Sequence, residues 1–454
     1  MAKTTDMTTG SPFKKIFLFA LPMALAYMLQ TLYSLGDTLI VSLSRGEDAV
    51  TGINLTSSLI FLVNGFSQGL SAGFGLVLSQ YVGAKNQERM RKSVATSVVL
   101  TAIFSSVLSV IFVIFSPQIL VLMNTNKQFI GYSVPYIRSI FAGLVCASYY
   151  NLSSQIMRAM GDSKTPLFIL ILCAILNLGL NSLLFFTDLK PEWAGWATVI
   201  SQGISAIVGF IIVFKRYPIL RFTKRDLKSI SSLAGKHLSM GVPMAFQSSI
   251  TAVSCMIQQL AFNSLPNPIF AMAQSTGSKI DNMFSSVLFG STVAMGVYCG
   301  QNYGANKVDR IKNGVKASYL MGLIFTAFAM LLNFLLCRPL ASILLYGATD
   351  EVIDLIFKYI AIQSLFYYAL CVLLYNRESL QGLGKSSLTV IGGTIELIMR
   401  CFACFVLAKN FGFNGACLSN CLAWLGGAIC FIISFKIVIK KMENKAKTGN
   451  VFTA

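Results

Sequence analysis

Charged residues are scarce in this chain. Only 12% of its 454 residues are Asp, Glu, Lys or Arg, whereas about 25% is usual in soluble domains. A soluble fold has no core for a dozen apolar runs of twenty or more residues, but such runs match the hydrocarbon layer of a bilayer, which is about 30 Å thick. The composition therefore excludes a soluble enzyme, a secreted disulfide scaffold, a disordered chain and a nucleic-acid-binding protein. It predicts an all-α polytopic membrane protein.

Histidine and loop cysteine are also missing. The chain has one histidine, His237, and no HExxH or paired-histidine pattern, so the usual ligands of a zinc enzyme are absent. Its eleven cysteines lie inside or at the edges of apolar runs, and we interpret even the CxxC pair, Cys401 and Cys404, as packing residues. We therefore expect no resident metal, no cofactor and no enzyme activity. We interpret His237 as a solvated loop residue at the cytoplasmic mouth of a span.

The sequence contains twelve apolar runs, which we predict to be membrane spans. The first run is too long for the apolar part of a cleavable signal peptide, so we expect it to remain as the first span. Gly, Pro and polar residues occur in several runs, which is tolerated where a helix faces a neighbour or a water-filled cavity. The predicted spans are 16–44, 52–80, 93–116, 131–157, 165–187, 194–214, 238–262, 270–302, 314–337, 353–376, 386–409 and 414–437.

Basic residues gather on one side of these spans. The N-terminus, alternate loops and the tail, each with the adjoining helix ends, hold 27 of the 36 Lys and Arg residues. The opposite loops with their helix ends hold 5, and the other 4 lie within spans. Cytoplasmic loops carry such an excess, so both termini are predicted to be cytoplasmic in the inner (plasma) membrane. The basic linker 215–237 is interpreted as a topology anchor; binding of anionic lipid is the alternative.

An internal repeat divides the chain. At an offset of 221, Leu21–Ala24 lies on Val242–Ala245, and Gln80, Gly83 and Ala84 lie on Gln301, Gly304 and Ala305. Because each half has six spans, both enter the membrane the same way round. This predicts two six-helix bundles related by a pseudo-two-fold axis along the membrane normal, with a cavity between them. The predicted domains are a cytoplasmic N-terminus (1–15), the first bundle (16–214), the basic linker (215–237), the second bundle (238–437) and a basic cytoplasmic tail (438–454).

Polar residues form stripes along several spans. Such a stripe is costly against lipid, so it faces protein or water. For the uncharged members, hydrogen bonding between helices is the plainer interpretation. The stripes contain Gln30, Ser34, Asp37 and Ser44; Ser57, Asn64, Gln68 and Ser71; Asn177 and Asn181; Thr198 and Gln202; Gln247, Thr251, Ser254 and Gln258; and Gln274, Ser278, Asp281 and Ser285.

Ionisable residues inside spans point to function more strongly. Glu396 and Arg400 are four residues apart on one helix, so we predict that they neutralise each other. Lys279 and Asp281 are two apart and do not face each other. Asp37 has no basic residue within one helical turn, which makes it the acid hardest to explain as structural.

Five segments at helix ends resemble the signatures of the MATE (multidrug and toxic compound extrusion) transporters. Each segment is weakly specific alone, but five in the right order on a six-plus-six chain form a specific match. They are Leu32–Thr38, Ser79–Ala84, Arg158–Pro166, Lys279–Asn282 and Gly300–Ala305.

The resemblance implies an antiporter that exports amphipathic, often cationic, organic compounds in exchange for a cation, by alternating access. Its motif places the coupling ion in the first bundle, at Asp37, Asn177, position 181 and Thr198. Many relatives have Asp where this chain has Asn181, and some have a Glu near Gln258, so the first bundle keeps one carboxylate and the second keeps Asp281 as its main acid. One carboxylate suits either H⁺ or Na⁺, and the loss of the second acid favours H⁺.

The predicted cavity residues are Gln30, Ser34, Gln68, Gln258, Gln274, Ser278, Lys279 and Asp281, and Pro22 is predicted to allow span 1 to bend. We expect small organic substrates, contact with membrane lipids, no nucleic-acid partner and a monomer. A flippase for lipids or lipid-linked precursors is the alternative, although Lys279 and Arg400 are the only cations available to hold phosphate. A membrane enzyme is a more remote alternative, because no nucleophile–base pair lies within the spans.

Overall fold

The computed structural model describes residues 5–123, 125–228, 230–345 and 347–447, without the side chains at positions 34, 35, 37–39, 45 and 47. Within these ranges the chain forms helices joined by short turns, and no strand is present. The helices are α1 (Pro12–Arg45), α2 (Glu47–Asn54), α3 (Ser57–Gly83), α4 (Gln87–Leu122), α5 (Lys127–Ala142), α6 (Leu144–Ala159), α7 (Lys164–Phe186), α8 (Trp193–Arg216), η1 (Pro218–Leu220), α9 (Lys224–Leu227), α10 (Ile230–Asn263), α11 (Pro268–Gly304), α12 (Val308–Leu344), α13 (Asp350–Leu365), α14 (Tyr367–Gly382), α15 (Ser386–Phe402), η2 (Ala403–Leu407) and α16 (Ala408–Lys447).

The helices account for the twelve predicted spans. Among the described residues, nine helical segments are long and apolar enough to cross a membrane, and two bent pairs, α5 with α6 and α13 with α14, raise the number to eleven. Each pair is bent by 47°. The last segment, Ser386–Ala446, has 61 residues and holds the last two predicted spans. Gly412 interrupts it with φ 54°, a conformation that glycine adopts at little cost. The all-α, twelve-span fold is therefore confirmed.

Two compact units make up the described chain. Unit 1 contains Thr5 and residues 29–248, and unit 2 contains residues 6–28 and 249–447. Their boundaries lie inside α1 and α10, so one part of each of these helices packs in each unit. The predicted bundles 16–214 and 238–437 divide the chain by the order of its segments, and those boundaries stay a prediction.

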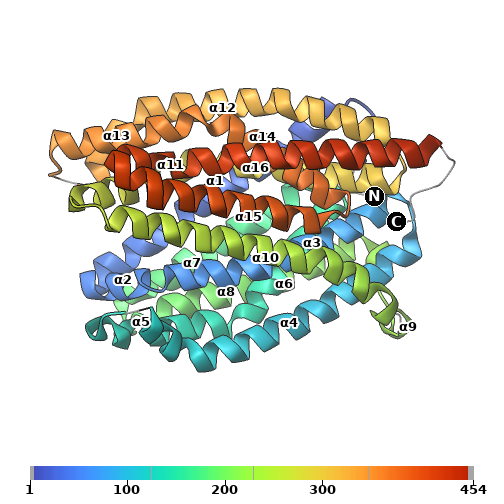
Figure 1. Cartoon of the computed structure of the whole chain (residues 1–454). Coiled ribbons are helices and arrows are strands. Elements are labelled where there is room, and N and C mark those ends of the chain that lie inside the picture. The colour runs from blue at the N-terminus through green and yellow to red at the C-terminus, as the bar shows by residue number, and fades with distance from the viewer. Residues whose placement is uncertain (1–4, 124, 229, 346, 448–454) are drawn as a thin grey trace. The chain divides into compact units, whose positions relative to one another are not determined.

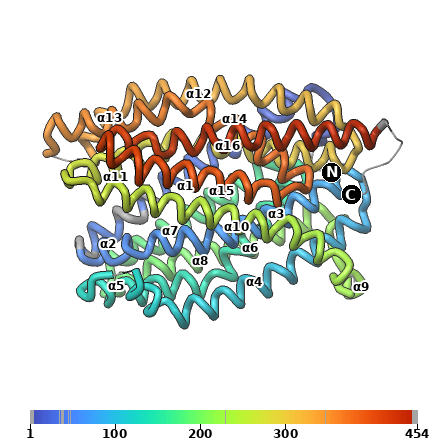
Figure 2. The backbone as a smooth tube through the Cα atoms, viewed as in Figure 1, coloured from blue at the N-terminus to red at the C-terminus, as the bar shows by residue number. Residues whose placement is uncertain are grey.

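Each unit has its own set of neighbouring helices. In unit 1, α6 packs against α3, α4 and α8, and α7 packs against α8 (Figure 1). In unit 2, α11 packs against α12, α13 and α14, while α16 packs against α14 and α15. The backbone tube shows α12 running beside α13 in unit 2 (Figure 2).

Repeat-related positions make the same close helix contact in each unit. In unit 1, a Cβ added to Gly69 of α3 would lie 2.6 Å from the Cα of Ala245 in α10. In unit 2, a Cβ added to Gly290 of α11 would lie 2.5 Å from the Cα of Ala24 in α1. Both separations are too short for any side chain, so glycine is required. Gly69 and Gly290, like Ala24 and Ala245, are related by the offset of 221 found in the sequence.

The segments that lead into α1 and α10 are docked in their units. In unit 2, Met7 is fully buried, and its N–H donates to Oε1 of Gln301 at 3.1 Å. Arg310 donates to the carbonyls of Met7 and Gly10 at 3.1 and 2.9 Å. In unit 1, Arg91 of α4 forms an ion pair with Asp226 at 3.3 Å.

His237 corrects one prediction. It is fully buried in α10, with Nε2 at 3.0 Å from the Ser93 hydroxyl and Nδ1 at 2.9 Å from the Leu233 carbonyl oxygen. The interpretation as a solvated loop residue was wrong because α10 begins at Ile230, well before the predicted start of the span at 238.

Candidate functional site

Three of the four predicted ion-coupling residues lie together in unit 1. Asn177 and Asn181 are one turn apart on α7 and fully buried, and Thr198 lies on α8. Nδ2 of Asn181 donates to Oδ1 of Asn177 at 3.1 Å, and Nδ2 of Asn177 donates to the Thr198 hydroxyl at 3.1 Å. That hydroxyl donates to the carbonyl of Ala194 at 3.0 Å. A directed chain of hydrogen bonds therefore connects the two helices inside the membrane.

The fourth residue, Asp37, has its side chain outside the described part of the structure, as does Ser34. Its neighbour Gly36 is described, and a Cβ added there would lie 3.5 Å from Leu178 of α7. Leu178 follows Asn177 directly in the chain. The backbone of α1 beside Asp37 therefore approaches α7 next to the asparagine pair.

The second repeat holds different residues at the related positions. The offset of 221 places Gln258 of α10 where α1 has Asp37, and Gln258 donates to the Ser419 hydroxyl of α16 at 2.9 Å. An offset of 223, at which Met160 and Gly161 lie on Leu383 and Gly384, places Arg400 of α15 where α7 has Asn177. Arg400 is 4% exposed and donates to the Ser254 hydroxyl at 2.8 Å. In unit 2 these positions therefore hold an amide and a permanent cation.

The main acid of unit 2, Asp281, bonds to a tyrosine. Asp281 is 7% exposed on α11, and Tyr367 donates its hydroxyl to Oδ1 at 2.6 Å. The Tyr367 hydroxyl in turn accepts from Nδ2 of Asn333 at 2.7 Å, and Asn333 also donates to Ser364 at 3.1 Å. A buried carboxylate is costly unless it is hydrogen-bonded, and this short bond offsets part of the cost.

A helix bend positions this tyrosine. Ser364 lies near the end of α13, Tyr367 is the first residue of α14, and the two helices are bent by 47° between them. The bend turns both side chains toward α12, where Asn333 interrupts an apolar run. The acid, the tyrosine and the amide thus come from three helices of unit 2.

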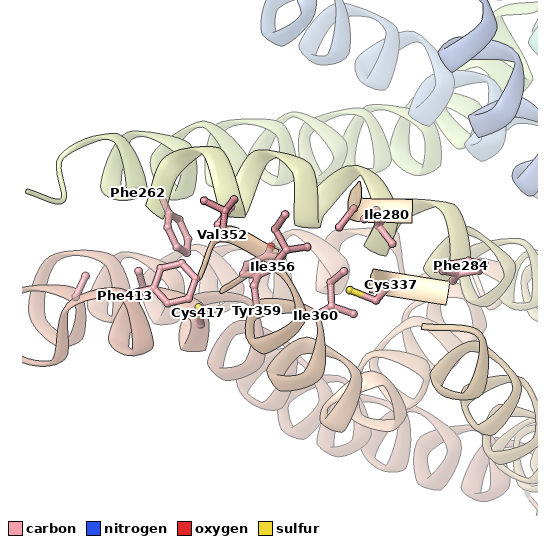
Figure 3. Packing of buried hydrophobic residues seen from close by; sticks show 14 residues of the cluster. Phe262, Ile280, Phe284, Cys337, Val352, Ile356, Tyr359, Ile360, Phe413 and Cys417 are labelled. Atoms are coloured by element: carbon pink, nitrogen blue, oxygen red, sulfur yellow. The ribbon is translucent and has the colours of Figure 1, made fainter. Parts of the chain in front are cut away.

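Apolar residues pack next to this network. Ile280 precedes Asp281 in α11, and Ile280, Phe284 and Tyr359 belong to a buried cluster that includes residues of α10, α12, α13 and α16 (Figure 3). Tyr359 also makes a polar contact, because its hydroxyl lies 3.1 Å from that of Ser278. Such packing excludes water, which strengthens electrostatic interactions at the carboxylate.

Several acceptors in unit 2 are left without a hydrogen-bond partner among the described residues. They are Oδ1 of Asn333, Oε1 of Gln363 and Oε1 of Gln274, all buried. Carbonyl oxygens and a carboxylate are the ligands that a hard cation takes. Unit 2 therefore offers oxygen atoms, close in sequence to the Asp281 network, that its own groups do not fully use.

The structure places the other predicted cavity residues in varied surroundings. Gln30, Gln68 and Lys279 are exposed in the chain. Gln274 is buried and donates to the Ser278 hydroxyl at 3.0 Å, so that predicted stripe is brought together. Pro22 lies inside α1, as Pro243 lies inside α10.

The predicted Glu396–Arg400 pair is in part a second correction, because Arg400 interacts electrostatically with Glu396 but forms no direct ion pair with it among the described residues. Both residues are buried, but no ion pair joins them in the described part of the chain, and Oε1 of Glu396 has no described partner. The Arg400 side chain extends instead to Ser254 on α10. Helical spacing permitted the pair, and tertiary packing directed the arginine elsewhere.

Sequence reasoning missed Tyr367 and Asn333 as partners of Asp281. Asn333 carried a usable signal, because an amide inside the apolar run 314–337 needs a polar partner in the membrane. Tyr367 was one aromatic residue among many, and nothing in its local sequence marks it out.

The comparisons with known proteins agree with this fold. The MatE family model matches residues 22–183 and 243–406, so its two matched segments begin 221 residues apart. The probable multidrug resistance protein YoeA of Bacillus subtilis (strain 168) is 26% identical over 446 residues, with 96% of this chain and 94% of that protein covered. The FAD transporter of Shewanella oneidensis is 21% identical, with 94% and 96% covered. A structure described as an outward-facing conformation of a multidrug resistance MATE family transporter matches with a TM-score of 0.88 at 18% identity, covering 98% of this chain and 99% of that one.

The chain belongs to the MatE family. It is a multi-span membrane transporter of the multidrug-efflux type and not an enzyme. This family membership implies the plasma membrane as its location.

Proposed function

We propose that the chain is a secondary antiporter that exports amphipathic, cationic organic compounds in exchange for H⁺ or Na⁺ by alternating access. The observation that carries the proposal is the buried chain of Asn181, Asn177 and Thr198 beside the α1 backbone at Gly36. An acid on α1 at this place has polar groups to bind and no described basic partner on its own helix turn. Its occupancy by a cation then changes how α1 packs.

The hydrogen-bond directions support H⁺ as the coupling ion. Oδ1 of Asn177 already accepts from Asn181, and the Thr198 hydroxyl both accepts from Asn177 and donates to Ala194. A sodium ion takes several oxygen ligands, and these two oxygens would have to coordinate it while keeping their present hydrogen bonds. A proton needs only the carboxylate of Asp37.

Neutralising Asp37 is the proposed switch. Loss of its charge alters its bonds to the polar chain and lets α1 repack, with Pro22 lowering the cost of a bend. Occupancy by the ion thereby shifts a two-state equilibrium. Asp281 is proposed to contribute to substrate recognition from unit 2, where a negative charge in a low-dielectric setting attracts organic cations.

The relatives support small organic molecules as the substrates. Proteins named as multidrug resistance or multidrug export proteins cover nearly the whole chain. One relative is named as an FAD transporter, so an anionic substrate is the natural counter-test. We further propose that the transporter acts as a monomer.

Reconstituted transport tests the proposal. Purified protein in proteoliposomes is given a panel of fluorescent organic cations, with flavin adenine dinucleotide as an anionic comparison. A pH gradient and a Na⁺ gradient are imposed separately. We expect uphill movement of cations under the pH gradient; movement that follows neither gradient would contradict antiport.

The proposed topology places both termini in the cytoplasm. A single cysteine introduced at Lys224 is expected to react with an impermeant maleimide only from the cytoplasmic side, and one at Lys127 only from outside. The unmodified chain supplies the background from its native cysteines, of which Cys255 is exposed. Reaction of both introduced cysteines from one side would contradict the twelve-span orientation.

A further inference from the structure

An apolar groove lies on unit 1, and its lining includes none of the polar chain Asn181, Asn177 and Thr198. Its volume is about 700 Å³, and its lining comes from α4, α6, α8 and the segment that follows α8. The lining residues are Val98, Val145, Cys146, Tyr149, Gly203, Ala206, Ile207, Phe210, Ile211, Phe214, Lys215, Arg221 and Phe222.

Small residues and aromatic rings both line the groove. A Cβ added to Gly203 would lie 3.3 Å from Sγ of Cys146, so the two helices stay close there. The rings of Tyr149 and Phe210 meet edge to face, with their centroids 5.8 Å apart. The Tyr149 hydroxyl donates to the carbonyl of Val98 at 3.0 Å. The one hydroxyl in the lining is thus already used, which leaves an apolar interior.

Two cations stand at one end of this apolar surface. Lys215 is exposed and forms no ion pair within the described residues, and Arg221 uses Nε to donate to the Phe214 carbonyl at 2.9 Å. The adjacent Arg216 differs, because it pairs with Asp162 at 3.0 Å. No Asp or Glu is among the described lining residues, so nothing in the groove neutralises Lys215 and Arg221.

The two cations of the groove lie at the level of lipid headgroups, and its apolar part lies at the level of acyl chains. α8 is a candidate span that ends at Arg216, so Lys215 and Arg221 lie where the hydrocarbon layer gives way to headgroups. Ile207 and Ile211 of the rim are 64% and 47% exposed, as expected of side chains that contact acyl chains. Anionic lipids are attracted to such juxtamembrane cations.

We propose that this groove binds a phospholipid with an anionic headgroup. One acyl chain lies along Cys146, Gly203 and Ala206, and the phosphate is held between Lys215 and Arg221. The charge complementarity and the membrane depth of the cations select this occupant over a soluble ligand. The site is independent of the coupling chemistry proposed above, and failure of one leaves the other intact.

Native mass spectrometry of the purified full-length chain tests the charge requirement. The probes are phosphatidylglycerol and phosphatidylcholine with identical acyl chains, added at equal concentration. The unmodified protein is expected to retain phosphatidylglycerol preferentially. Each cation near a membrane surface contributes about fivefold to binding, so Lys215→Gln/Arg221→Gln should lose about 25-fold.

A matched control uses two neighbouring cations of the linker. Lys224 and Arg225 line a separate polar pocket with Glu88 and Asp226, so Lys224→Gln/Arg225→Gln removes the same charge outside the groove. Preferential retention should persist in this control. Equal loss in both double variants would show general surface attraction and overturn the site, as would equal retention of the two lipids by the unmodified protein.

The apolar part has its own variant. Gly203→Phe places a ring in the groove, where the added Cβ would lie 3.3 Å from Sγ and 3.8 Å from Cβ of Cys146. It should reduce phosphatidylglycerol retention while leaving the thermal unfolding midpoint close to that of Lys224→Gln/Arg225→Gln. Undiminished retention in a folded Gly203→Phe protein would overturn the placement of the acyl chain.

Discussion

The related positions of the two repeats differ in chemistry. In unit 1, α7 contributes neutral Asn177, and the repeat places an acid, Asp37, on α1. In unit 2, the related positions hold Arg400 and Gln258. An acid among amides has room for a mobile cation, whereas a site that contains a guanidinium holds a permanent positive charge. The comparison shows two similar frames whose related positions carry different charge, and the ion position proposed above is the one in unit 1.

The repeat also relates Asp37 to a residue of unit 2 whose hydrogen bond is described. Gln258 bonds to Ser419 of α16, and α16 is the repeat of α8, which carries Thr198. The offset of 221 thus relates the bonded pair Gln258 and Ser419 to Asp37 and Thr198 in the sequence. Asp281 is outside this relation, because its repeat position in unit 1 is the apolar Ile60 of α3.

The largest effect is expected from Asp37→Asn, which keeps size and hydrogen bonding but removes titration. Gradient-driven efflux should be abolished, while expression and substrate binding should stay near those of the unmodified protein. The measurement is uphill transport in proteoliposomes under each gradient. Near-normal pumping by the purified variant would contradict the coupling role and transfer it to Asp281.

A smaller, selective effect is expected from Asp281→Asn. Transport of cationic substrates should fall severalfold more than transport of neutral substrates, because one negative charge is lost from a low-dielectric region. Tyr367→Phe is the matched control: it removes the 2.6 Å hydrogen bond but keeps the carboxylate. If both variants affect cationic and neutral substrates alike, Asp281 only ties α11 to α14.

The permanent charge in unit 2 gives the third prediction. Arg400→Gln should lower the free energy of unfolding by about 2 kcal/mol, because a charge-assisted bond to Ser254 is lost. The thermal unfolding midpoint of the purified protein reports this. Arg338→Gln, which breaks an exposed ion pair with Asp354, serves as a control and should cost at most about 1 kcal/mol. Equal losses of unfolding free energy in the two variants would show that the buried Arg400 stabilises unit 2 no more than an exposed ion pair does.

The spans were predictable because apolar length and basic asymmetry are local properties of the sequence. The bends before Leu144 and before Tyr367 were not, since the apolar run continues through each of them. Nor was the division of α1 and α10 between units, which depends on contacts of Ala24 with Gly290 and of Ala245 with Gly69. The offset of 221 relates these positions in the sequence, but only the structure shows which helices pack against each other.

In the candidate site, too, local spacing was predictable and long-range contacts were not. Spacing of four residues put Asn177 and Asn181 on one face, and the family motif added Thr198. The bond of Arg400 to Ser254 was missed because helical spacing does not show whether a side chain bonds within its helix or across to another. His237 was placed wrongly because α10 begins at Ile230, before the predicted start of the span. The bond from Tyr367 to Asp281 spans 86 residues, and no local pattern encodes it.

The smallest expected effect concerns the docked segments, which the repeats hold by different means. Unit 2 holds Met7 and Gly10 through their carbonyls with Arg310, whereas unit 1 holds Asp226 through an ion pair with Arg91. Burial raises the pKa of Asp226, but hydrogen bonds from Thr223 and the charge of Arg91 outweigh it, so the pKa lies below its ordinary value of 3.8. A lowered pKa in the folded state stabilises the protein above pH 3.8 and ceases to do so as pH falls through the lowered value.

Asp226→Asn should therefore lower the free energy of unfolding by about 1 kcal/mol at neutral pH, as expected for loss of a capping carboxylate. The difference from the unmodified protein should shrink as pH falls below 3.8, where the unmodified carboxyl also becomes neutral. Arg310→Gln is the comparison in unit 2, because its carbonyl partners do not titrate and its cost should persist at low pH. The pKa of Asp6, in the same segment, is also lowered. Asp6→Asn is therefore measured alongside Arg310→Gln, to show how much of any pH dependence comes from Asp6. Thermal unfolding midpoints at several pH values measure all three variants. A pH-independent cost for Asp226→Asn would show that the linker is held by shape and not by its charge, and the contrast between the two docked segments would then disappear.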